Sequence, residues 1–217
     1  TAVGLITIFG SSYMMTHSNK IYPRISKYLS VFEKKGKKID EHKYIKGESY
    51  DIIVFGYNRI GLSLIGTIKS LNKKFLIVDY NPEAIADAAG SGHDCRYGDA
   101  EDSEFLDELN LSDPKMIIST IPDAETNLLL IEKIRERNKD AIVIIVSHQI
   151  EEALRLYESG ATYVIMPYFL GGEYASTLIQ KCGLDLGEFF KEKMKHISHL
   201  KMRSKLKHEH PRPEKGR

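Results

Sequence analysis

The stretch from Ile52 to Gly61, IIVFGYNRIG, constrains the fold more than any other part of this 217-residue chain. Its apolar, β-branched first half predicts a buried strand that ends at a glycine. Apolar residues then recur at helical spacing and predict a helix; they are Ile60, Leu62, Leu64, Ile65 and Ile68. A strand, a tight turn and a helix in this order are typical of the opening of a βαβ unit that binds dinucleotides.

An acidic residue follows this opening at the distance that a nucleotide site requires. Asp79 lies 23 positions after Gly56, at the end of the next apolar run, Phe75 to Val78. In such units an acid placed in this way accepts hydrogen bonds from the ribose hydroxyls. The start of the preceding helix offers free N–H groups and the positive end of the helix dipole, which favour a phosphate. The sequence therefore predicts a nucleotide site beside the first strand.

The glycine pattern departs from G-x-G-x-x-G at one position. Asn58 stands where a middle glycine would let the backbone approach a pyrophosphate. Asparagine tolerates a left-handed backbone better than most residues, but its side chain occupies space. A mononucleotide such as AMP is therefore comparatively more plausible here than it would be with glycine.

Strand-like and helix-like segments alternate from residue 50 to residue 166. We expect strands at 50–55, 75–79, near 96–97, and at 115–120, 141–146 and 163–166, with helices at 60–71, 82–89, 101–109, 123–138 and 150–158. The continuous apolar run 141–146 predicts a strand buried on both faces, and the inward side chains of helix 123–138 are expected to be Leu128, Leu129, Ile131 and Ile134. The alternation predicts an α/β fold, a Rossmann-like six-strand parallel sheet with helices on both faces, in a domain covering 48–168.

The N-terminal 47 residues have a different character. Residues 1–15 carry no charge and are fewer than the roughly 20 that span a bilayer. We interpret 1–16 as the end of the last transmembrane helix of a longer protein; a buried helix of a soluble protein is the alternative. Lys20 to Lys38 contains seven basic residues and one acid, with apolar residues at helical spacing. We therefore expect 17–47 to be a basic juxtamembrane helix and linker, near an anionic membrane surface at 20–38 and on the cytoplasmic side.

The net charge of +1 conceals a strong asymmetry. The first 47 residues carry nine Lys or Arg and three Asp or Glu, the last 27 carry ten and three, and the 143 between them hold 12 basic and 24 acidic residues. An acidic body whose basic residues are confined to its arms argues against nucleic-acid binding. The basic, hydrophilic residues 196–217 have the composition of a disordered tail.

The apolar residues after Pro167 have no further strand to pack against. A terminal apolar helix outside a completed sheet often packs on another subunit, so we expect helices in 169–195 that form a homodimer. Packing on the chain's own domain is the alternative. Neither the two cysteines, Cys95 and Cys182, nor the histidines near the C-terminus have metal-ligand spacing, and no metal site or disulfide framework is expected.

Five stretches of the chain together resemble the RCK (KTN, TrkA-N) nucleotide-binding domain that regulates potassium channels and transporters. They are IIVFGYNRIG, LIVDYNPE, the YGDA of 97–100, ISTIPDAETN and LYESGATYVIMP. The leading segment, ITIFGSSYMMTHSNKIYPRISKYLSVFE, resembles the end of the last transmembrane helix and the exit helix of Kef-like monovalent cation:proton antiporters. The two resemblances occur side by side in one chain. This combination indicates a transporter and not a channel subunit or a stand-alone regulator.

The resemblance implies a cytosolic regulatory domain of a potassium (or sodium)/proton antiporter in the cell membrane. AMP or NAD(H) would bind as a regulatory ligand that is not turned over, so no catalytic residues are implied. The partners would be the chain's own membrane transport domain and a second copy of the chain.

The resemblance also implies roles for individual residues. Arg59 would contact phosphate, Asp79 would hold the ribose hydroxyls, Asp99 and Ala100 would line the adenosine end, and Thr120 would lie near the phosphate loop. Arg59 as a surface ion-pairing residue and Asp99 as the cap of a helix beginning at 101 are the structural alternatives. The predicted ligand-binding residues are Gly56, Tyr57, Asn58, Arg59, Ile60, Gly61, Asp79, Tyr80, Asp99, Ala100 and Thr120.

Two other functions are compatible with this fold. A soluble NAD-dependent oxidoreductase would need a substrate domain and a catalytic group, but few residues follow the sheet and the sequence contains no Tyr-x-x-x-Lys pair. A module of this type that has lost nucleotide binding would act as a dimerisation scaffold, and Asn58 keeps that alternative open.

Overall fold

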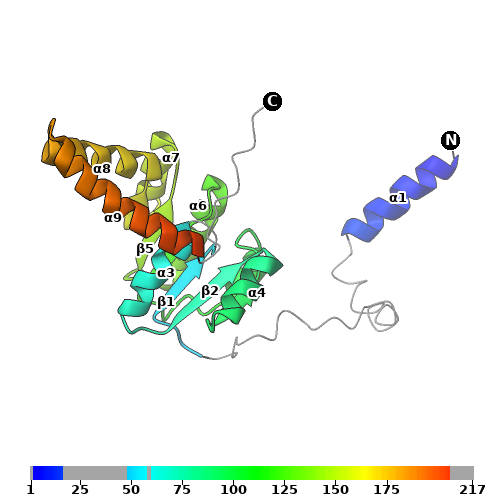
Figure 1. Cartoon of the computed structure of the whole chain (residues 1–217). Coiled ribbons are helices and arrows are strands. Elements are labelled where there is room, and N and C mark those ends of the chain that lie inside the picture. Colours follow the sequence, from blue (N-terminus) through cyan, green and yellow to red (C-terminus); the bar gives the residue numbers. More distant parts are fainter. Residues whose placement is uncertain (1, 17–47, 58–59, 206–217) are drawn as a thin grey trace. The chain divides into compact units, whose positions relative to one another are not determined.

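The computed structural model of the chain describes residues 2–16, 48–57 and 60–205 (Figure 1). The chain divides into two units, 1–38 and 39–217. In the first unit, α1 (Ala2–Thr16) is a helix with exposed apolar side chains, among them Val3, Ile6 and Phe9. Within the described residues, no helix combines the length and the apolar character that crossing a membrane requires. The basic helix predicted in 17–47 lies outside the described residues.

The second unit is built on the predicted six-strand parallel sheet. The strands are β1 (Ile52–Phe55), β2 (Phe75–Asp79), β3 (Cys95–Tyr97), β4 (Met116–Ser119), β5 (Ile142–Val146) and β6 (Tyr163–Ile165). Their order in the sheet is β3-β2-β1-β4-β5-β6, and every pair is parallel. This order is that of a doubly wound Rossmann fold, in which the direction of winding reverses between β1 and β4.

Helices cover both faces of the sheet. One face packs on α3 (Ile60–Ser70) and α4 (Pro82–Gly90), and the other packs on α5 (Ser103–Glu108), α6 (Ala124–Arg137) and α7 (Ile150–Glu158). Alternate residues of β1 face opposite sides: Val54 packs with Ile65 of α3, whereas Phe55 packs with Leu130 of α6. The two hydrophobic cores therefore follow from the two-residue period of the strands.

Two predictions about burial are wrong in detail. β5 is not buried on both faces, because Ile142 remains 41% exposed and Ile144 is half-buried. Helices α3 and α4 pack over the other half of that face, around β1 to β3. In α6, Ile131 and Ile134 are fully buried as expected, together with Leu130, whereas Leu128 and Leu129 are half-buried beside the core.

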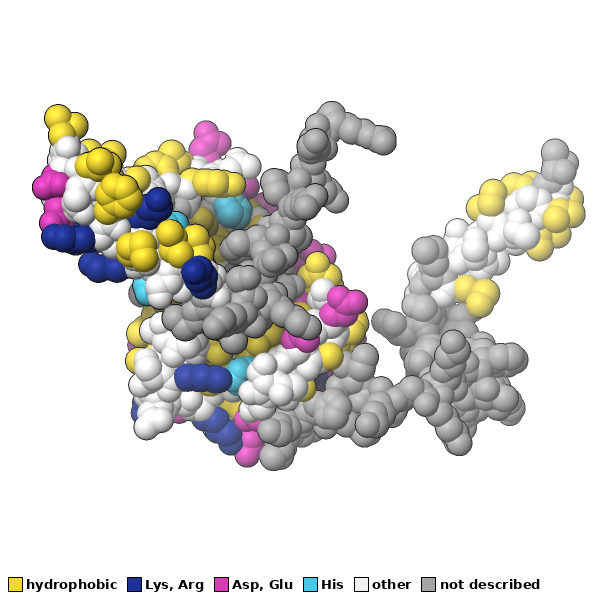
Figure 2. All heavy atoms as spheres, in the orientation of Figure 1, with side chains coloured by type: hydrophobic (Ala, Val, Ile, Leu, Met, Phe, Trp, Pro, Cys, Tyr) yellow, Lys and Arg dark blue, Asp and Glu magenta, His cyan; other side chains and the backbone are white. Residues whose placement is uncertain are grey.

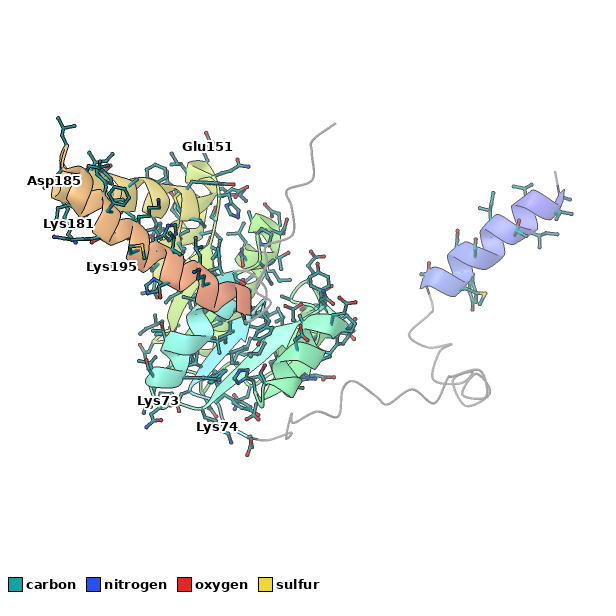
Figure 3. All side chains as sticks on the ribbon, in the orientation of Figure 1. Lys73, Lys74, Glu151, Lys181, Asp185 and Lys195 are labelled. Atoms are coloured by element: carbon teal, nitrogen blue, oxygen red, sulfur yellow. The ribbon has the colours of Figure 1, made fainter. Side chains whose placement is uncertain are left out.

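The chain continues after β6 into two further helices, α8 (Pro167–Cys182) and α9 (Leu186–Lys205). Gly183 adopts a φ of 54° between them, a conformation that glycine adopts without steric cost. Lys181 of α8 and Lys195 of α9 (both labelled in Figure 3) contact the Glu192 carboxylate at 2.8 and 3.0 Å. α8 and α9 therefore form a helical hairpin.

Helix α9 is longer than the basic composition of its end suggests. It includes 196–205, which were expected to belong to a disordered tail. Ion pairs one turn apart, such as Glu192 with Lys195, and apolar residues at helical spacing, such as Phe190 and Met194, favour the helical state. Residues 206–217 lie outside the described residues.

Candidate functional site

Four of the predicted site residues lie at one edge of the sheet. Gly56 follows β1, Asp79 ends β2, Asp99 follows β3 and Thr120 follows β4. The carboxyl ends of parallel strands share one edge, and these four strands are neighbours in the sheet. The residues therefore gather around the reversal between β1 and β4, where open α/β sheets bind their ligands.

The turn after β1 is closely packed and requires both of its glycines. Gly56 has a φ of 87°, and a Cβ there would overlap the Thr120 hydroxyl. A Cβ on Gly61 would lie well inside 3.0 Å of the Gly56 carbonyl oxygen. Thr120 Oγ1 donates a hydrogen bond to that same carbonyl at 3.1 Å. The start of α3 is thereby held against the end of β1 and β4, and Asn58 and Arg59, between the two glycines, lie outside the described residues.

Asp79 fixes the same turn from the β2 side. Its side chain is buried, with 7% exposed, and one carboxylate oxygen accepts the Tyr57 N–H at 2.8 Å. The other oxygen accepts the Asn81 N–H at 2.8 Å. Asp79 therefore positions the turn without any ligand. Each carboxylate oxygen has a further lone pair, so the predicted contact with a ribose hydroxyl remains chemically open.

Three other predicted residues near this edge of the sheet differ in how far their side chains are buried. The Tyr57 side chain is buried against the His93 ring, and burial raises the pKa of its phenol. Only the backbone of Tyr57 belongs to the turn. Ile60 begins α3 and is half-buried, whereas the Tyr80 side chain is 67% exposed beside Asp79.

The turn after β3 places Asp99 and Ala100 differently. Asp99 Oδ1 accepts the Glu101 N–H at 3.0 Å, and Ala100 is buried in the core. Helix α5 begins at Ser103 with Asp102 as its N-terminal cap. The alternative role of Asp99 as the cap of a helix at 101 is therefore wrong.

A polar cluster at the start of α6 contains Ser119 and Asn127, which the expected site residues do not include. Buried Ser119 donates to Asn127 Oδ1 at 2.6 Å, and Asn127 Nδ2 donates to the Ile121 carbonyl at 2.9 Å. These bonds fix the turn that carries Thr120. Asn127 could have indicated this cluster, because it occupies a position of α6 that faces the sheet and a buried amide needs hydrogen-bond partners.

The site edge is rich in negative charge. Asp123 caps α6, and the N–H and hydroxyl of Thr126 hold the pKa of its carboxyl below the usual range. In the sequence, the turns 56–59, 80–81, 98–102 and 120–123 contain Arg59 as their one basic residue, against Asp99, Glu101, Asp102 and Asp123. Among the residues that the structure describes, no group of three or more His, Cys, Asp or Glu could hold a metal ion.

Comparisons with known proteins agree with this architecture. The chain is 26% identical over 116 residues to the glutathione-regulated potassium-efflux system protein KefC of Escherichia coli O139:H28 (strain E24377A / ETEC). The match covers 54% of this chain and 19% of KefC, so the chain matches about a fifth of the length of that curated relative.

Solved structures share the fold. The TrkA-N domain of inner membrane protein ybaL from Escherichia coli matches with a TM-score of 0.55 and 22% identity, over 62% of this chain and 97% of that chain. The Kef CTD of Shewanella denitrificans in its AMP-bound form matches with a TM-score of 0.52 and 16% identity, over 72% of this chain and 94% of that chain. The GsuK channel bound to NAD matches with a TM-score of 0.52 and 21% identity, over 76% of this chain and 29% of that chain.

The family itself is shown by the sequence match. A model of the TrkA-N domain family matches residues 52–167, which run from the first residue of β1 to the first residue of α8. This range contains the whole parallel sheet and every predicted ligand-binding residue. The chain therefore belongs to the TrkA-N domain family.

Proposed function

We propose that this chain is a regulatory nucleotide-binding domain of a potassium (or sodium)/proton antiporter, on the cytoplasmic side of the cell membrane. The observation that carries the proposal is the packed turn of Gly56, Gly61 and Thr120, held by Asp79 at the reversal of a parallel sheet. Homology to KefC, a potassium-efflux protein, supports the transporter context. AMP or NAD(H) is the proposed ligand, since structural neighbours are described with these nucleotides bound.

The nucleotide would act as a ligand and would not be turned over. A ligand shifts a conformational equilibrium only by its difference in affinity for the two states. Couplings between distinct sites are typically about 1–3 kcal/mol. A nucleotide that binds one state of this domain more tightly would thus bias the membrane transport domain, the proposed partner of the chain, through the basic segment 17–47.

The test of this regulation is cation flux by the transporter that contains this chain, reconstituted in vesicles. Adding AMP or NADH on the side of this domain should change the rate of potassium-driven proton flux, and the change should disappear in a Gly61→Ala variant that keeps its basal flux. If the domain binds both nucleotides but neither changes the rate of proton flux, the regulatory role is refuted.

The α8–α9 hairpin is the proposed dimer interface. Its exposed apolar side chains are visible along both helices in Figure 2 and include Tyr168, Phe169, Tyr174, Ile179, Leu186, Phe190 and Met194. An exposed apolar surface of this extent usually marks an interaction site. A second copy of the chain is the proposed occupant, because homo-oligomers with two-fold symmetry are the commonest assemblies.

Charge placed on this surface should dissociate the dimer. We expect the double variant Tyr174→Glu, Phe190→Glu to have the mass of a monomer, 24.7 kDa, in light scattering at a concentration where the parent chain has twice that mass. Gln180→Glu, an exposed polar position of α8, is the matched control and should stay dimeric. A double variant with the parent's mass would place the interface elsewhere.

A nucleotide-free dimerisation scaffold is the second candidate function. It is favoured by Asn58 in place of the middle glycine. The bonds from backbone N–H groups to Asp79 also give this residue a structural role that needs no ligand. If the chain is a scaffold, it should form a dimer and bind no nucleotide. If it is a regulatory domain, it should form a dimer and also bind nucleotide.

A further inference from the structure

We propose that the end of α9 from Lys193 to Lys205, which we call the basic end of α9, binds the surface of an anionic lipid bilayer. The cytoplasmic leaflet of a cell membrane carries anionic lipids, and the proposed function places the chain on that side. This contact is separate from the nucleotide site, and it would add to the contact that the sequence predicts for 20–38.

The basic end of α9 differs in charge from the body of the chain. It contains five Lys or Arg, two His and no Asp or Glu, whereas residues 48–190 hold 12 basic and 24 acidic residues. An anionic surface repels an acidic body and attracts a basic segment. Clusters of about four to eight Lys or Arg on an amphipathic helix are typical of binding to anionic lipids. The charge of the basic end therefore fits a bilayer surface.

Two lysines of the basic end have no acidic partner within the described ranges. Lys195 contacts the Glu192 carboxylate at 3.0 Å, but no ion pair among the described residues involves Lys193 or Lys201. Lys201 and Lys205 also occupy helix positions four residues apart, where like charges destabilise a helix. An anionic partner would relieve this repulsion and pair with the remaining charges.

The lysines share one face of α9 with apolar residues. Lys193, Ile197, Leu200 and Lys201 follow the spacing i, i+4, i+7 and i+8, which places them on one side of a helix. Both lysines are exposed, Leu200 is 50% exposed and Ile197 is half-buried. Figure 2 shows the Lys and Arg side chains of α9 among its exposed apolar side chains. A helix that lies on a membrane has this combination, because its apolar side chains enter the headgroup layer while lysines reach the phosphates.

A second copy of the chain suits the basic end less well. In a two-fold dimer the same patch of each copy forms the contact. The hairpin from Pro167 to Lys205 carries seven Lys or Arg and four Asp or Glu, so a contact that included both basic ends would bring two positive surfaces together. The proposed dimer contact would avoid this repulsion if it ended before Lys193. The basic ends would then be left for an anionic partner.

Cosedimentation of the full chain with lipid vesicles tests this contact. We expect stronger binding to vesicles of phosphatidylcholine and phosphatidylglycerol in equal parts than to phosphatidylcholine alone. The double variant Lys193→Gln, Lys201→Gln should bind the anionic vesicles about twentyfold to thirtyfold more weakly, because each lysine near an anionic surface contributes about fivefold. The difference between parent and variant should shrink at high salt, where surface charges are screened.

The control is the double variant Lys69→Gln, Lys73→Gln, which removes the same charge from exposed positions at the end of α3 and in the turn after it. It should bind the anionic vesicles as the parent does. Both double variants should keep the parent's mass in light scattering and its affinity for AMP, so that a loss of lipid binding is not a loss of the fold.

Three results would overturn the lipid contact. They are parent-like binding of anionic vesicles by Lys193→Gln, Lys201→Gln, an equal loss in the control variant, and tighter binding of the chain to a DNA duplex than to the anionic vesicles. The last of these would assign the basic end to nucleic acid. A chain that binds vesicles as expected but binds no nucleotide would support the lipid contact and overturn the proposed regulatory function alone.

Discussion

Replacing Gly61 by alanine should lower the affinity for nucleotide by up to about a hundredfold while the sheet stays folded. The added Cβ would overlap the backbone carbonyl oxygen of Gly56, so α3 and the turn after β1 must move apart. Overpacking of this kind typically costs about 1–3 kcal/mol, and each 1.4 kcal/mol is about tenfold in affinity. We expect about fivefold to hundredfold weaker binding of AMP or NAD⁺ in calorimetry, since the displaced N–H groups would contact the phosphate directly.

Gly66 of the same helix supplies the matched control. Nothing lies within 4 Å of a Cβ added there, so Gly66→Ala should bind nucleotide as the parent does. It should also be more stable by about 0.5–1 kcal/mol, the usual gain from glycine to alanine inside a helix. Parent-like affinity in Gly61→Ala would show that the packed turn is not the phosphate site.

Replacing Arg135 by alanine should cause a large loss of stability, about 3 kcal/mol, because several hydrogen bonds from a charged donor are lost together. Its guanidinium joins three separate segments. Nε and Nη2 donate to the Gly160 carbonyl at 2.9 and 2.8 Å, and Nη1 donates to the Ala141 carbonyl at 2.9 Å and to the Asn138 carbonyl at 3.2 Å. Arg135 thus ties the end of α6 to the start of β5 and to the turn before β6.

Urea unfolding followed by circular dichroism measures this loss. Arg135→Lys should recover only a small part of it, because an ammonium group lacks the planar fork that reaches several carbonyls. Arg155→Ala is the control, since its ion pair with Glu125 at 3.1 Å is exposed on both sides and such pairs contribute about 0–1 kcal/mol. Equal losses in Arg135→Ala and Arg155→Ala would contradict the bridging role.

The sequence predicted the sheet well because local signals agree there. The bounds of β2 and α7 match the predictions at both ends, and both segments are preceded by polar residues, Lys74 and Gln149. The exposure of Ile142 was not predictable in the same way. A continuous β-branched run indicates a strand, but how much of each face is covered depends on where distant helices pack.

The site residues also differ in whether local sequence patterns could predict them. Gly56, Gly61 and Asp79 follow from spacing within one βαβ unit, and the structure brings them together. The contact of Glu101 with Thr126 joins the turn after β3 to α6, 25 positions away in the sequence, so no local pattern reveals it. The backbone hydrogen bonds of Asp79 were also missed, since a motif match names the ligand contact and not the support that the residue gives its own turn.

One measurement tests the central claim most directly: a calorimetric titration of the full chain with AMP, NAD⁺ and NADH, repeated with Gly61→Ala and Gly66→Ala. We expect saturable binding of at least one nucleotide at one site per chain, up to about a hundredfold weaker in the first variant and unchanged in the second. A folded chain that binds none of the three, or that binds them equally well with alanine at residue 61, would contradict it and leave the dimerisation scaffold as the better account.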